Sequence, residues 1–440
     1  MAKFNGAKKS FSSWISKKNK IHVAKVTPTN KPVTLQQLLK PILIFGHAFA
    51  VIPVIGLHRK NEVNVRFKWI SWRCLYSVTF LIGQIFMCIM CFIDIFRSET
   101  TLKSTSSAIF YGITCITIVM FLRVSSNWPK LVMHAIQTED LDPNFDKSLS
   151  HKCNATCAVI LILALFEHIL SLMYAFSEAM ECYPYTNIYE GFVAVFYPWV
   201  YKYISYTAML GITTQVLHFQ ATFIWNFSDL FVICISYYLT SRLDNVNRKL
   251  LMAQGKYMPA SFWRTIREDY GRVTQLVRKI DEVINGIVFI SFANNLYFIC
   301  LQLFNTLEDG IKGNGECRAN GHRGLLAGYE APVYFIFSLV YLISRSVAVS
   351  LIASQVHSAS LVPAPVLYDV PSPVYCIEVQ RFIDQVNGDD VALSGMQFFT
   401  VTRGLLLTVA GTIVTYELVM LQFTPPSQTA GSIALNMSAT

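Results

Sequence analysis

The last apolar segment of the chain, Phe398–Phe423, carries polar side chains at spacings that place them on one face of a helix. Steps of four, three, four and three residues separate the members of this polar stripe, which are Thr408, Thr412, Thr415, Val419 and Gln422. Polar groups at membrane depth need water or a polar partner, because hydrocarbon offers neither. The stripe therefore fits a helix that lines a water-filled pore. The alternative is a helix whose polar groups hydrogen-bond neighbouring helices.

Polar and aromatic residues also gather in four other apolar segments, in the halves that we expect to face the outside. These candidates for a ligand pocket are Glu167, Tyr174, Glu178, Tyr206, Asn294, Asn295, Gln302, Glu330, Tyr334 and Tyr341. Carboxylates and amides pair with sugar hydroxyls, and flat aromatic rings cover the apolar C–H face of a sugar. The residue types therefore predict a sugar pocket, and the alternative is a set of interhelical hydrogen bonds without a ligand.

Catalytic motifs are missing from the sequence. Glu167 and His168 form an ionisable pair inside an apolar segment, which marks a functional candidate. The sequence places no second carboxylate and no metal-type spacing around them. It contains neither a Walker loop nor a GxGxxG motif. We therefore expect a protein that is not an enzyme and that uses no cofactor or metal.

The composition indicates a membrane protein that crosses the bilayer several times. Hydrophobic residues make up 53% and charged residues 14% of the 440 residues, and the mean hydropathy is +0.42. A soluble domain usually contains about 25% charged residues. The formal net charge of +9 does not indicate nucleic-acid binding, because the basic residues concentrate in particular loops.

Seven apolar segments are long enough to cross a bilayer. They cover about residues 70–95, 106–124, 154–179, 204–239, 284–306, 331–353 and 397–423. If the N-terminus is cytoplasmic, the inner segments hold 28 Lys and Arg residues and the outer loops hold 6. The positive-inside rule then predicts an all-α membrane protein with seven transmembrane helices, a cytoplasmic N-terminus and an extracellular C-terminus.

These spans divide the chain into parts with different expected roles. Residues 1–69 form a cytoplasmic region that contains an interfacial or re-entrant segment, 41–57, which is too short to span comfortably. Residues 70–353 hold spans one to six, the ligand-binding bundle, with a cytoplasmic helical insert at 241–283. The remaining parts are a cytoplasmic anchor segment, the pore-lining span and an extracellular tail, at residues 354–396, 397–423 and 424–440.

The cytoplasmic insert and the anchor segment differ in their expected secondary structure. The insert is charged and has helical periodicity, so we expect it to extend two spans into the cytoplasm and to pack there. A solvated surface helix is the alternative. Four prolines between Pro363 and Pro373 argue against a regular helix in that stretch. A short helix at about 374–387 should follow it.

Two of the 11 cysteines, Cys182 and Cys317, fall in outer loops on this topology. The outer side is oxidising, whereas thiols on the cytoplasmic side stay reduced. Cys182 and Cys317 are therefore candidates for a disulfide.

Several phrases of the sequence resemble those of insect gustatory receptors, in the branch that detects sugars. The last span ends in Thr415-Tyr416, five further residues and Gln422-Phe423, which is similar to the C-terminal signature of that family. The branch has Gln before Ala or Cys where this chain has His47, a departure to which we attach no functional weight. The phrases that carry the resemblance are FGHAFAVIPVIGL (45–57), VRFKWISWRCLYS (65–77), NNLYFICLQLFN (294–305) and VALSGMQFFTVTRGLLLTVAGTIVTYELVMLQF (391–423).

The resemblance implies a function and an assembly. Insect gustatory receptors are ligand-gated cation channels that assemble as tetramers around one central pore. This chain would then be a plasma-membrane sugar receptor, working as a homo- or heterotetramer with related receptors. Its implied partners are a mono- or disaccharide, monovalent and divalent permeant cations and membrane lipid, and not nucleic acid. The resemblance places Gln422 and Phe423 at the pore constriction, and the stripe residues Val419, Thr415 and Thr412 face the same pore.

Three acidic residues near the expected pore have separate interpretations. Asp389 and Asp390 could select for cations at the cytoplasmic entry, or they could cap the last helix, since Asp favours a helix N-terminus. Glu417 points away from the polar stripe, toward neighbouring helices, where a carboxylate needs a partner.

Two other classes of function stay open on the sequence. A seven-helix receptor that acts through a separate effector would have the opposite orientation, so outside access to the C-terminus distinguishes it from a channel. A solute transporter would account for the polar membrane residues. Transporters commonly contain repeated halves, however, and this sequence shows no internal repeat.

Overall fold

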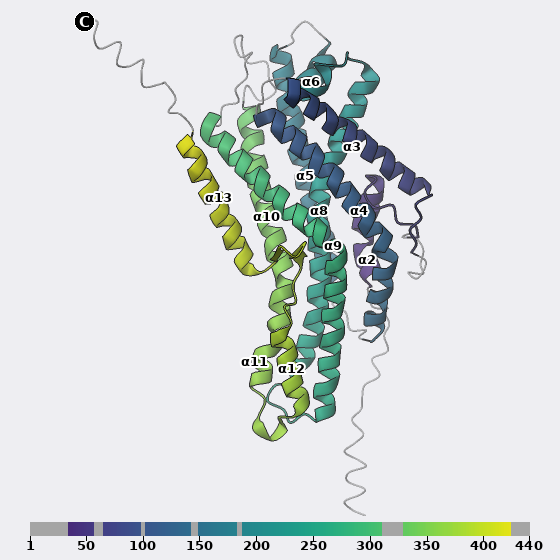
Figure 1. Cartoon of the computed structure of the whole chain (residues 1–440), viewed down its shortest axis with the longest axis vertical. Helices are drawn as coiled ribbons and strands as arrows, with labels where there is room; N and C mark the ends of the chain where they lie inside the picture. Colours follow the sequence, from purple (N-terminus) through teal and green to yellow (C-terminus); the bar gives the residue numbers. More distant parts are fainter. Residues whose placement is uncertain are drawn as a thin grey trace, which may run out of the picture. The chain divides into compact units, whose positions relative to one another are not determined.

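Long helices form almost all of the regular structure in the computed structural model, which describes residues 34–56, 65–97, 102–141, 148–182, 187–309 and 329–423 (Figure 1). The helices of the N-terminal half are α2 (Leu35–Ala48), α3 (Trp72–Arg97), α4 (Leu102–Leu141), α5 (Ser148–Cys182), α6 (Ile188–Phe196) and α7 (Pro198–Tyr201). The C-terminal half contains α8 (Ala208–Ala253), α9 (Ala260–Asp309), α10 (Glu330–Leu361), α11 (Pro363–Tyr368), η2 (Ser372–Val374), α12 (Ile377–Gly388), β1 (Ser394–Gly395), β2 (Phe399–Thr400) and α13 (Arg403–Phe423).

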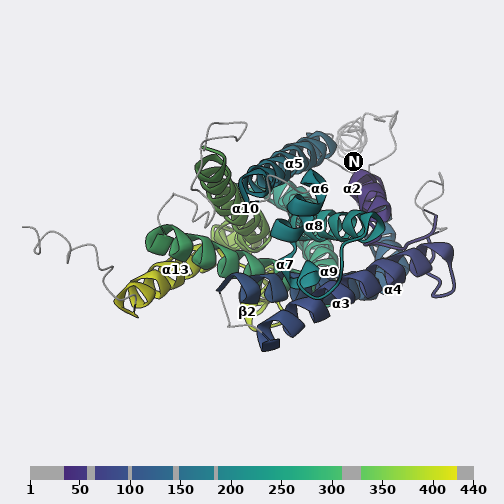
Figure 2. The same cartoon turned by 90° about the horizontal axis from the view of Figure 1, so that it is seen from above.

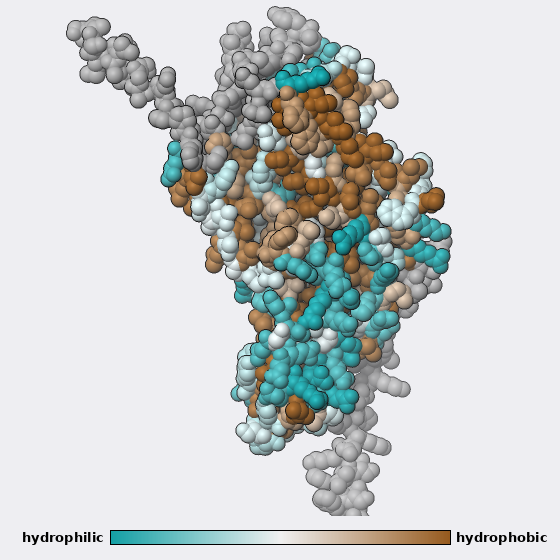
Figure 3. Space-filling model, viewed as in Figure 1, coloured by the Kyte–Doolittle hydropathy of each residue, from teal (hydrophilic) through white to brown (hydrophobic). Residues whose placement is uncertain are grey.

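Six of these helices are long and apolar enough to cross a membrane, within the described ranges: α3, α4, α5, α8, α9 and α10. The seventh expected span corresponds to α13, which has 21 residues and lies beside α9 and α10 in both views of the ribbon (Figures 1 and 2). On the face shown in Figure 3, apolar residues crowd the upper half and hydrophilic residues cover much of the lower half. This division fits a bundle whose upper part contacts lipid and whose lower part contacts water.

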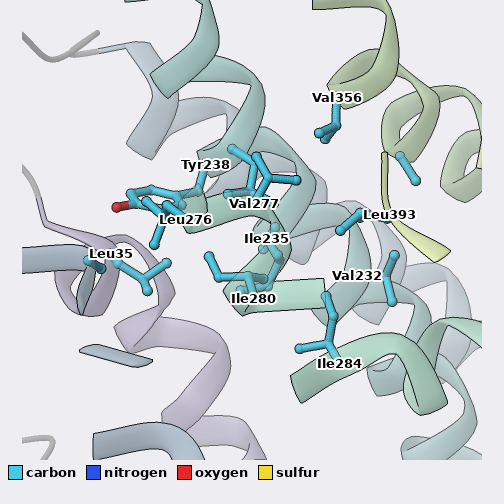
Figure 4. Packing of buried hydrophobic residues seen from close by; sticks show 14 of the residues in the cluster. Leu35, Val232, Ile235, Tyr238, Leu276, Val277, Ile280, Ile284, Val356 and Leu393 are labelled. Carbon is cyan, nitrogen blue, oxygen red and sulfur yellow. The ribbon is translucent and has the colours of Figure 1, made fainter. Parts of the chain in front are cut away.

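Helices α8 and α9 continue well beyond their apolar stretches, as expected for the insert at 241–283. Their extensions are not solvated surface helices, because Leu243, Tyr270, Leu276 and Ile280 are fully buried. In Figure 4 these extensions pack with residues of neighbouring elements, such as Leu35, Val356 and Leu393. We call this part the cytoplasmic core, following the predicted topology.

One buried carboxylate, Glu139 at the end of α4, joins three elements of the cytoplasmic core. Its Oε1 accepts hydrogen bonds from the Leu35 backbone N–H at 2.9 Å and from the Tyr238 hydroxyl at 2.7 Å. Arg242 Nη2 lies 3.2 Å from the same oxygen, and both charged side chains are almost completely buried. Glu139 therefore satisfies an open N–H at the start of α2 and ties α2 and α4 to α8.

The segment predicted at 41–57 is helical only in its first part. Helix α2 begins at Leu35 because the Thr34 hydroxyl caps it, accepting from the Gln37 N–H at 3.3 Å. It ends at Ala48, and Ile55 then pairs with Arg66 in an isolated β-bridge. Helix α2 therefore begins six residues before the predicted segment and ends within it, and the interfacial or re-entrant placement of 41–57 stays a prediction.

The second span, predicted at 106–124, lies within the longer, 40-residue helix α4. The fourth span begins at Ala208 rather than 204, because the Thr207 hydroxyl caps α8 by accepting from the Leu210 N–H at 3.4 Å. Tyr206 therefore precedes the helix.

The proline-rich stretch 363–373 also contains a helix, contrary to the prediction. Pro363 and Pro365 lie in the first turn of α11, where a missing backbone N–H costs nothing. The stretch continues as the 3₁₀ turn η2, and α12 then covers Ile377–Gly388, close to the helix expected at about 374–387.

The last span was predicted from residue 397, but residues up to Thr400 form a hairpin. Strands β1 and β2 are antiparallel, and Met396 and Gln397 between them adopt positive φ angles of 50° and 63°. Asp281 of α9 holds β1, because its carboxylate accepts from both the backbone N–H and the hydroxyl of Ser394 at 2.7 Å. The start of α13 is therefore fixed relative to α9 by a short, tethered connection.

Candidate functional site

A cavity of about 320 Å³ lies among α4, α5, α6, α7, α8, α9 and α10. This volume falls within the range of small-molecule pockets, about 300–1,000 Å³. Aromatic rings form much of its wall, including Phe110 of α4, Trp225 of α8 and Phe298 of α9. Carboxylates, hydroxyls and imidazoles interrupt these rings, so the cavity offers both stacking surfaces and hydrogen-bonding groups.

Four of the predicted sugar-binding residues line this cavity: Glu167, Tyr174, Glu178 and Tyr334. The first three come from one face of α5, because residues four or seven positions apart lie on the same side of a helix. The rings of Tyr174 and Tyr334 stack, with centroids 6.0 Å apart and planes 11° apart. The side chains of Tyr174 and Glu178 also lie close enough to interact. The predicted face of α5 therefore does line the cavity, and Tyr334 of α10 lines it as well.

Glu167 is connected to two further helices by hydrogen bonds. The Ser338 hydroxyl on α10 donates to Glu167 Oε1 at 2.6 Å. The predicted residue Gln302 on α9 donates to the Ser338 hydroxyl at 2.9 Å. Gln302 thus lies behind the cavity wall and not on it, and it supports Glu167 through Ser338.

The other predicted pocket residues lie outside the cavity. Tyr206 packs its ring against Tyr189 and Tyr201 on the approach to α8. Glu330 is buried at the first position of α10. Asn294 lines a separate void of about 10 Å³. Asn295 and Tyr341 belong to a buried polar network.

That network is centred on an ion pair, Asp229–Arg345, which sequence reasoning missed. Arg345 Nε lies 2.8 Å from Asp229 Oδ2, and their side chains are 2% and 0% exposed. The amide of Asn295 and the hydroxyl of Ser291 donate to Asp229, the former at 3.0 Å. Arg345 donates to the side-chain oxygen of Asn226. Each charge is thus both paired and hydrogen-bonded, which a buried ion pair requires.

The same network holds one wall of the cavity. The guanidinium of Arg345 lies 4.8 Å from the centroid of the Trp225 ring, a cation–π arrangement. The Trp225 Nε1–H donates to Asn295 Oδ1 at 3.1 Å. Tyr341 donates to Asn226 Oδ1 at 2.8 Å. Asn295 and Tyr341 therefore support the cavity indirectly, since the first of them holds Trp225.

Arg345 also corrects the topology count. It was counted among the 28 basic residues of the cytoplasmic segments, but it lies inside α10 and is buried. This change lowers the inner count by one and leaves the predicted orientation unaltered. An arginine in an apolar segment was the signal that could have revealed the pair.

Four further polar side chains of the cavity were also missed or only partly recognised, and they are Tyr111, His168, Trp199 and His218. His168 lies in the cavity wall with its ring 5.8 Å from that of His218, and Tyr111 shares a 3.0 Å hydrogen bond with His218 Nδ1. Trp199 of α7 lines the cavity, and its buried Nε1–H has no hydrogen-bond partner among the described residues. A buried donor without a partner is costly, so Trp199 is a natural contact for a hydroxyl-bearing ligand.

A small apolar cluster connects the cavity to α13. Phe298, which lines the cavity, packs with Ile299 and Leu342. Ile413 of α13 packs against this cluster, as does Trp225. A displacement of the cavity wall would therefore reach α13 through direct side-chain contacts.

The polar stripe of α13 faces outward from this single chain. Thr408, Thr412, Thr415, Val419 and Gln422 are all exposed. The three threonine hydroxyls donate to carbonyls of their own helix at 2.9–3.2 Å. Because the stripe is exposed, its hydroxyl oxygens can still accept hydrogen bonds from water or from another subunit. The side chain of Phe423 lies outside the described residues.

Glu417 lies on the opposite face of α13, as its position in the sequence predicted. It is 9% exposed, and neither carboxylate oxygen has a hydrogen-bond partner among the described residues. The partner that a carboxylate at this position requires is thus not found within the described parts of this chain.

Asp389 and Asp390 do not cap the last helix. They follow the C-terminus of α12, and α13 begins only at Arg403. Asp389 forms an ion pair with Arg278 at 2.7 Å, whereas Asp390 lies 3.5 Å from His357 Nδ1 and is largely exposed. Their role in cation selectivity stays a prediction.

The candidate disulfide falls outside what the structure describes. Cys182 is the last residue of α5, and only its backbone is described. Cys317 lies beyond the described ranges. The pairing stays a prediction.

The bundle of long apolar helices and its ligand-sized cavity define a multi-pass membrane protein with an internal cavity for a small molecule. The fold is similar to that of the olfactory receptor OR5 from Machilis hrabei, solved in complex with eugenol, with a TM-score of 0.61. The two chains share 16% sequence identity, and the match covers 88% of this chain and 98% of OR5.

Comparison with protein families identifies the chain more closely. The trehalose receptor family model matches residues 22–432. The chain is 32% identical over 395 residues to the gustatory receptor for sugar taste 64f of Drosophila melanogaster, covering 89% of this chain and 81% of that receptor. It is 31% identical over 399 residues to gustatory receptor 5a for trehalose of the same organism, covering 89% and 85%. The chain belongs to the trehalose receptor family of insect gustatory receptors.

Proposed function

We propose that this chain is a sugar receptor that acts as a ligand-gated, non-selective cation channel in the plasma membrane. The observation that carries the proposal is the position of Glu167. Its carboxylate lies in the wall of a sugar-sized cavity and is hydrogen-bonded to α10 through Ser338, which in turn is bonded to α9. A ligand that competes for this carboxylate acts directly on the two helices that pack against α13.

The cavity suits a mono- or disaccharide. Glu167 and Glu178 accept hydrogen bonds from sugar hydroxyls, and the unpartnered Nε1–H of Trp199 donates to a sugar oxygen. The rings of Tyr334 and Trp225 supply flat surfaces for the C–H face of a sugar ring. The names of the relatives, which refer to sugar taste and to trehalose, support the same class of ligand.

Gating requires two states of the pore that the sugar binds with different affinity. In our proposal the sugar occupies the cavity from the outside and breaks or redirects the Glu167–Ser338 hydrogen bond. The resulting shift of α9 and α10 reaches α13 through the contact of Ile413 with the Phe298 cluster. Four copies of α13 line the pore, and the constriction at Gln422 and Phe423 widens.

The proposed assembly is a homo- or heterotetramer with related receptors. The outward-facing polar stripe of α13 supports it, because an isolated subunit in lipid would expose this stripe to hydrocarbon. Seven spans, a cytoplasmic N-terminus, an extracellular C-terminus, surrounding lipid and permeant monovalent and divalent cations complete the proposal.

Whole-cell recording from cells that express this chain alone tests the proposal. We expect a panel of mono- and disaccharides to contain one or a few that evoke a cation current. Gln422→Ala should alter the conductance or ion selectivity of that current. Gln275→Ala, which removes an exposed amide on α9, is the matched control and should leave both unchanged.

Two results would count against the channel. A sugar-evoked second-messenger signal without current would support a receptor that acts through a separate effector. An epitope at the C-terminus that is reached only after cells are permeabilised would contradict the proposed orientation. Silence despite surface expression calls for the same recording with a related receptor coexpressed.

A further inference from the structure

Three cysteine thiols that play no part in the sugar cavity meet in the interior of the bundle. Cys153 and Cys157 lie one turn apart on α5, and Cys234 faces them from α8. The Cys153 and Cys234 sulfurs are 2.8 Å apart, those of Cys157 and Cys234 are 3.6 Å apart, and all three lie within 4.8 Å of one another. We call this group the thiol triad. Cys153 and Cys157 are four positions apart in the sequence, and only the packing of α8 against α5 brings Cys234 to them.

We propose that the thiol triad binds one soft metal ion, Cu(I), in a three-coordinate, all-sulfur site. A metal–sulfur distance of about 2.3 Å separates the sulfurs of a trigonal site by about 4 Å. The three sulfurs lie close to that arrangement: the Cys153–Cys234 pair at 2.8 Å must open by about 1 Å and the Cys157–Cys234 pair at 3.6 Å by about 0.4 Å on the same metal–sulfur distance. Each ligating thiol loses its proton to solvent as its sulfur binds the metal, so one Cu(I) bound by three thiolates releases three protons and no electron is transferred.

The donor set favours Cu(I) over a harder or divalent ion. Thiolate sulfur selects soft ions such as Cu(I), and no nitrogen or oxygen ligand belongs to the group. Structural zinc sites almost always use four ligands, whereas the described residues here supply three.

The surroundings would also protect the site. Cys153, Cys157 and Cys234 are each at most 7% exposed and belong to the same hydrophobic cluster as Leu149 and Ile160. Cys153 lies near the start of α5, on the predicted cytoplasmic side, where thiols stay reduced and available. A bound ion would cross-link α5, which carries Glu167, to α8, which carries Trp225. The metal site itself does not depend on the proposed sugar-channel function.

Metal analysis of the purified full-length chain tests the proposal. The protein is loaded with Cu(I) under reducing conditions, freed of excess ion and measured by plasma mass spectrometry. We expect about one copper per chain, and X-ray absorption at the copper edge should show sulfur ligands alone. Cys153→Ala, Cys157→Ala and Cys234→Ala should each lower the retained copper at least tenfold.

The matched control is Cys74→Ala, which removes a cysteine that is equally buried but lies outside the triad and should keep the full copper content. If the triad variants fail to fold, the absorption spectrum of the unaltered protein still decides the question. Copper well below one ion per chain, or nitrogen or oxygen ligands at the metal, would overturn the proposal. A disulfide between Cys153 and Cys234, found by alkylation without reductant, would overturn it in favour of a redox-sensitive link.

Discussion

The bundle around the cavity and the cytoplasmic core are built from the same long helices but in different ways. In the cytoplasmic core, α8 and α9 bury apolar side chains such as Leu243, Leu276 and Ile280 completely. Around the cavity, the same two helices carry His218, Trp225 and Phe298 against a hollow of about 320 Å³. The first region is packed and the second is open and polar.

Each region also contains one buried ion pair, and the two pairs have different neighbours. Glu139–Arg242 joins elements of the cytoplasmic core, where Glu139 also holds the start of α2. Asp229–Arg345 lies next to the cavity and holds Trp225 in its wall. Close-packed interiors resist small displacements of their side chains. Side chains around a cavity have free space next to them, so they can move when a ligand enters. We therefore expect the cytoplasmic core to act as a rigid base, against which the helices around the cavity move when a ligand binds.

Breaking the ion pair beside the cavity should have the largest effect. Arg345→Ala leaves Asp229 buried without its partner, and removing one member of such a pair costs about 3–5 kcal/mol. We expect a strong fall in thermal stability, measured by fluorescence-detected size-exclusion chromatography of the detergent-solubilised protein.

The matched double variant Asp229→Leu with Arg345→Met removes both charges and should recover much of that stability. Equal losses in the single and double variants would contradict the assignment of Asp229 and Arg345 as a mutually compensating pair.

A cavity created in the cytoplasmic core should rank second. Ile280→Ala removes a completely buried side chain, which costs about 2–5 kcal/mol in a packed interior. The thermal midpoint should fall while the sugar concentration for half-maximal current stays the same, if the core is only a base. Ile212→Ala, at a position that is 55% exposed on α8, is the control and should change neither. A large shift in sugar sensitivity for Ile280→Ala would show that the core takes part in gating.

Neutralising a cavity carboxylate should affect ligand binding and spare the fold. Glu167→Gln keeps the size of the side chain but weakens hydrogen bonds to the sugar and to Ser338. Hydrogen bonds to charged groups contribute about 1.5–3 kcal/mol. We therefore expect the half-maximal sugar concentration to rise by about tenfold or more, in whole-cell recordings.

Glu190→Gln, at an exposed position on α6, serves as the control and should leave the dose–response curve unchanged. An unaltered curve for Glu167→Gln at normal surface expression would remove Glu167 from the sugar site.

Residue spacing in the sequence correctly predicted features that depend on a single helix. The face of α5 with Glu167, Tyr174 and Glu178 and the outward stripe of α13 both follow from the helical period, and both are found. Helix ends were less predictable, because caps such as Thr207 and the tethered hairpin before α13 depend on single hydrogen bonds.

Contacts between distant helices could not be read from one sequence. Arg345 looked like a cytoplasmic charge until Asp229, 116 positions earlier in the numbering, was placed beside it. Tyr341 and Asn295 have the right chemistry for a sugar but bond other side chains instead. Polar residue type predicts that a group needs a partner, and only the packing of helices decides whether that partner is protein or ligand.

Trp199→Phe should have the smallest effect, and it distinguishes a residue that contacts the ligand from one that only supports the cavity wall. Trp199→Phe keeps an aromatic ring in the cavity wall and removes an indole N–H that has no partner among the described residues. Without ligand, stability should stay the same or rise slightly, because an unsatisfied buried donor is gone. With sugar, the loss of one hydrogen bond of about 0.5–1.5 kcal/mol should raise the half-maximal concentration by up to about tenfold.

The control for Trp199→Phe is Trp72→Phe at a position on α3 that is 80% exposed. Both variants are measured by thermal midpoint and by sugar dose–response curve. A lower thermal midpoint with an unchanged curve would show that Trp199 supports the wall without touching the ligand. A raised half-maximal concentration at an unchanged midpoint would place a sugar oxygen at the indole N–H. The cavity would then be the region where sugar binding begins the conformational change that opens the pore.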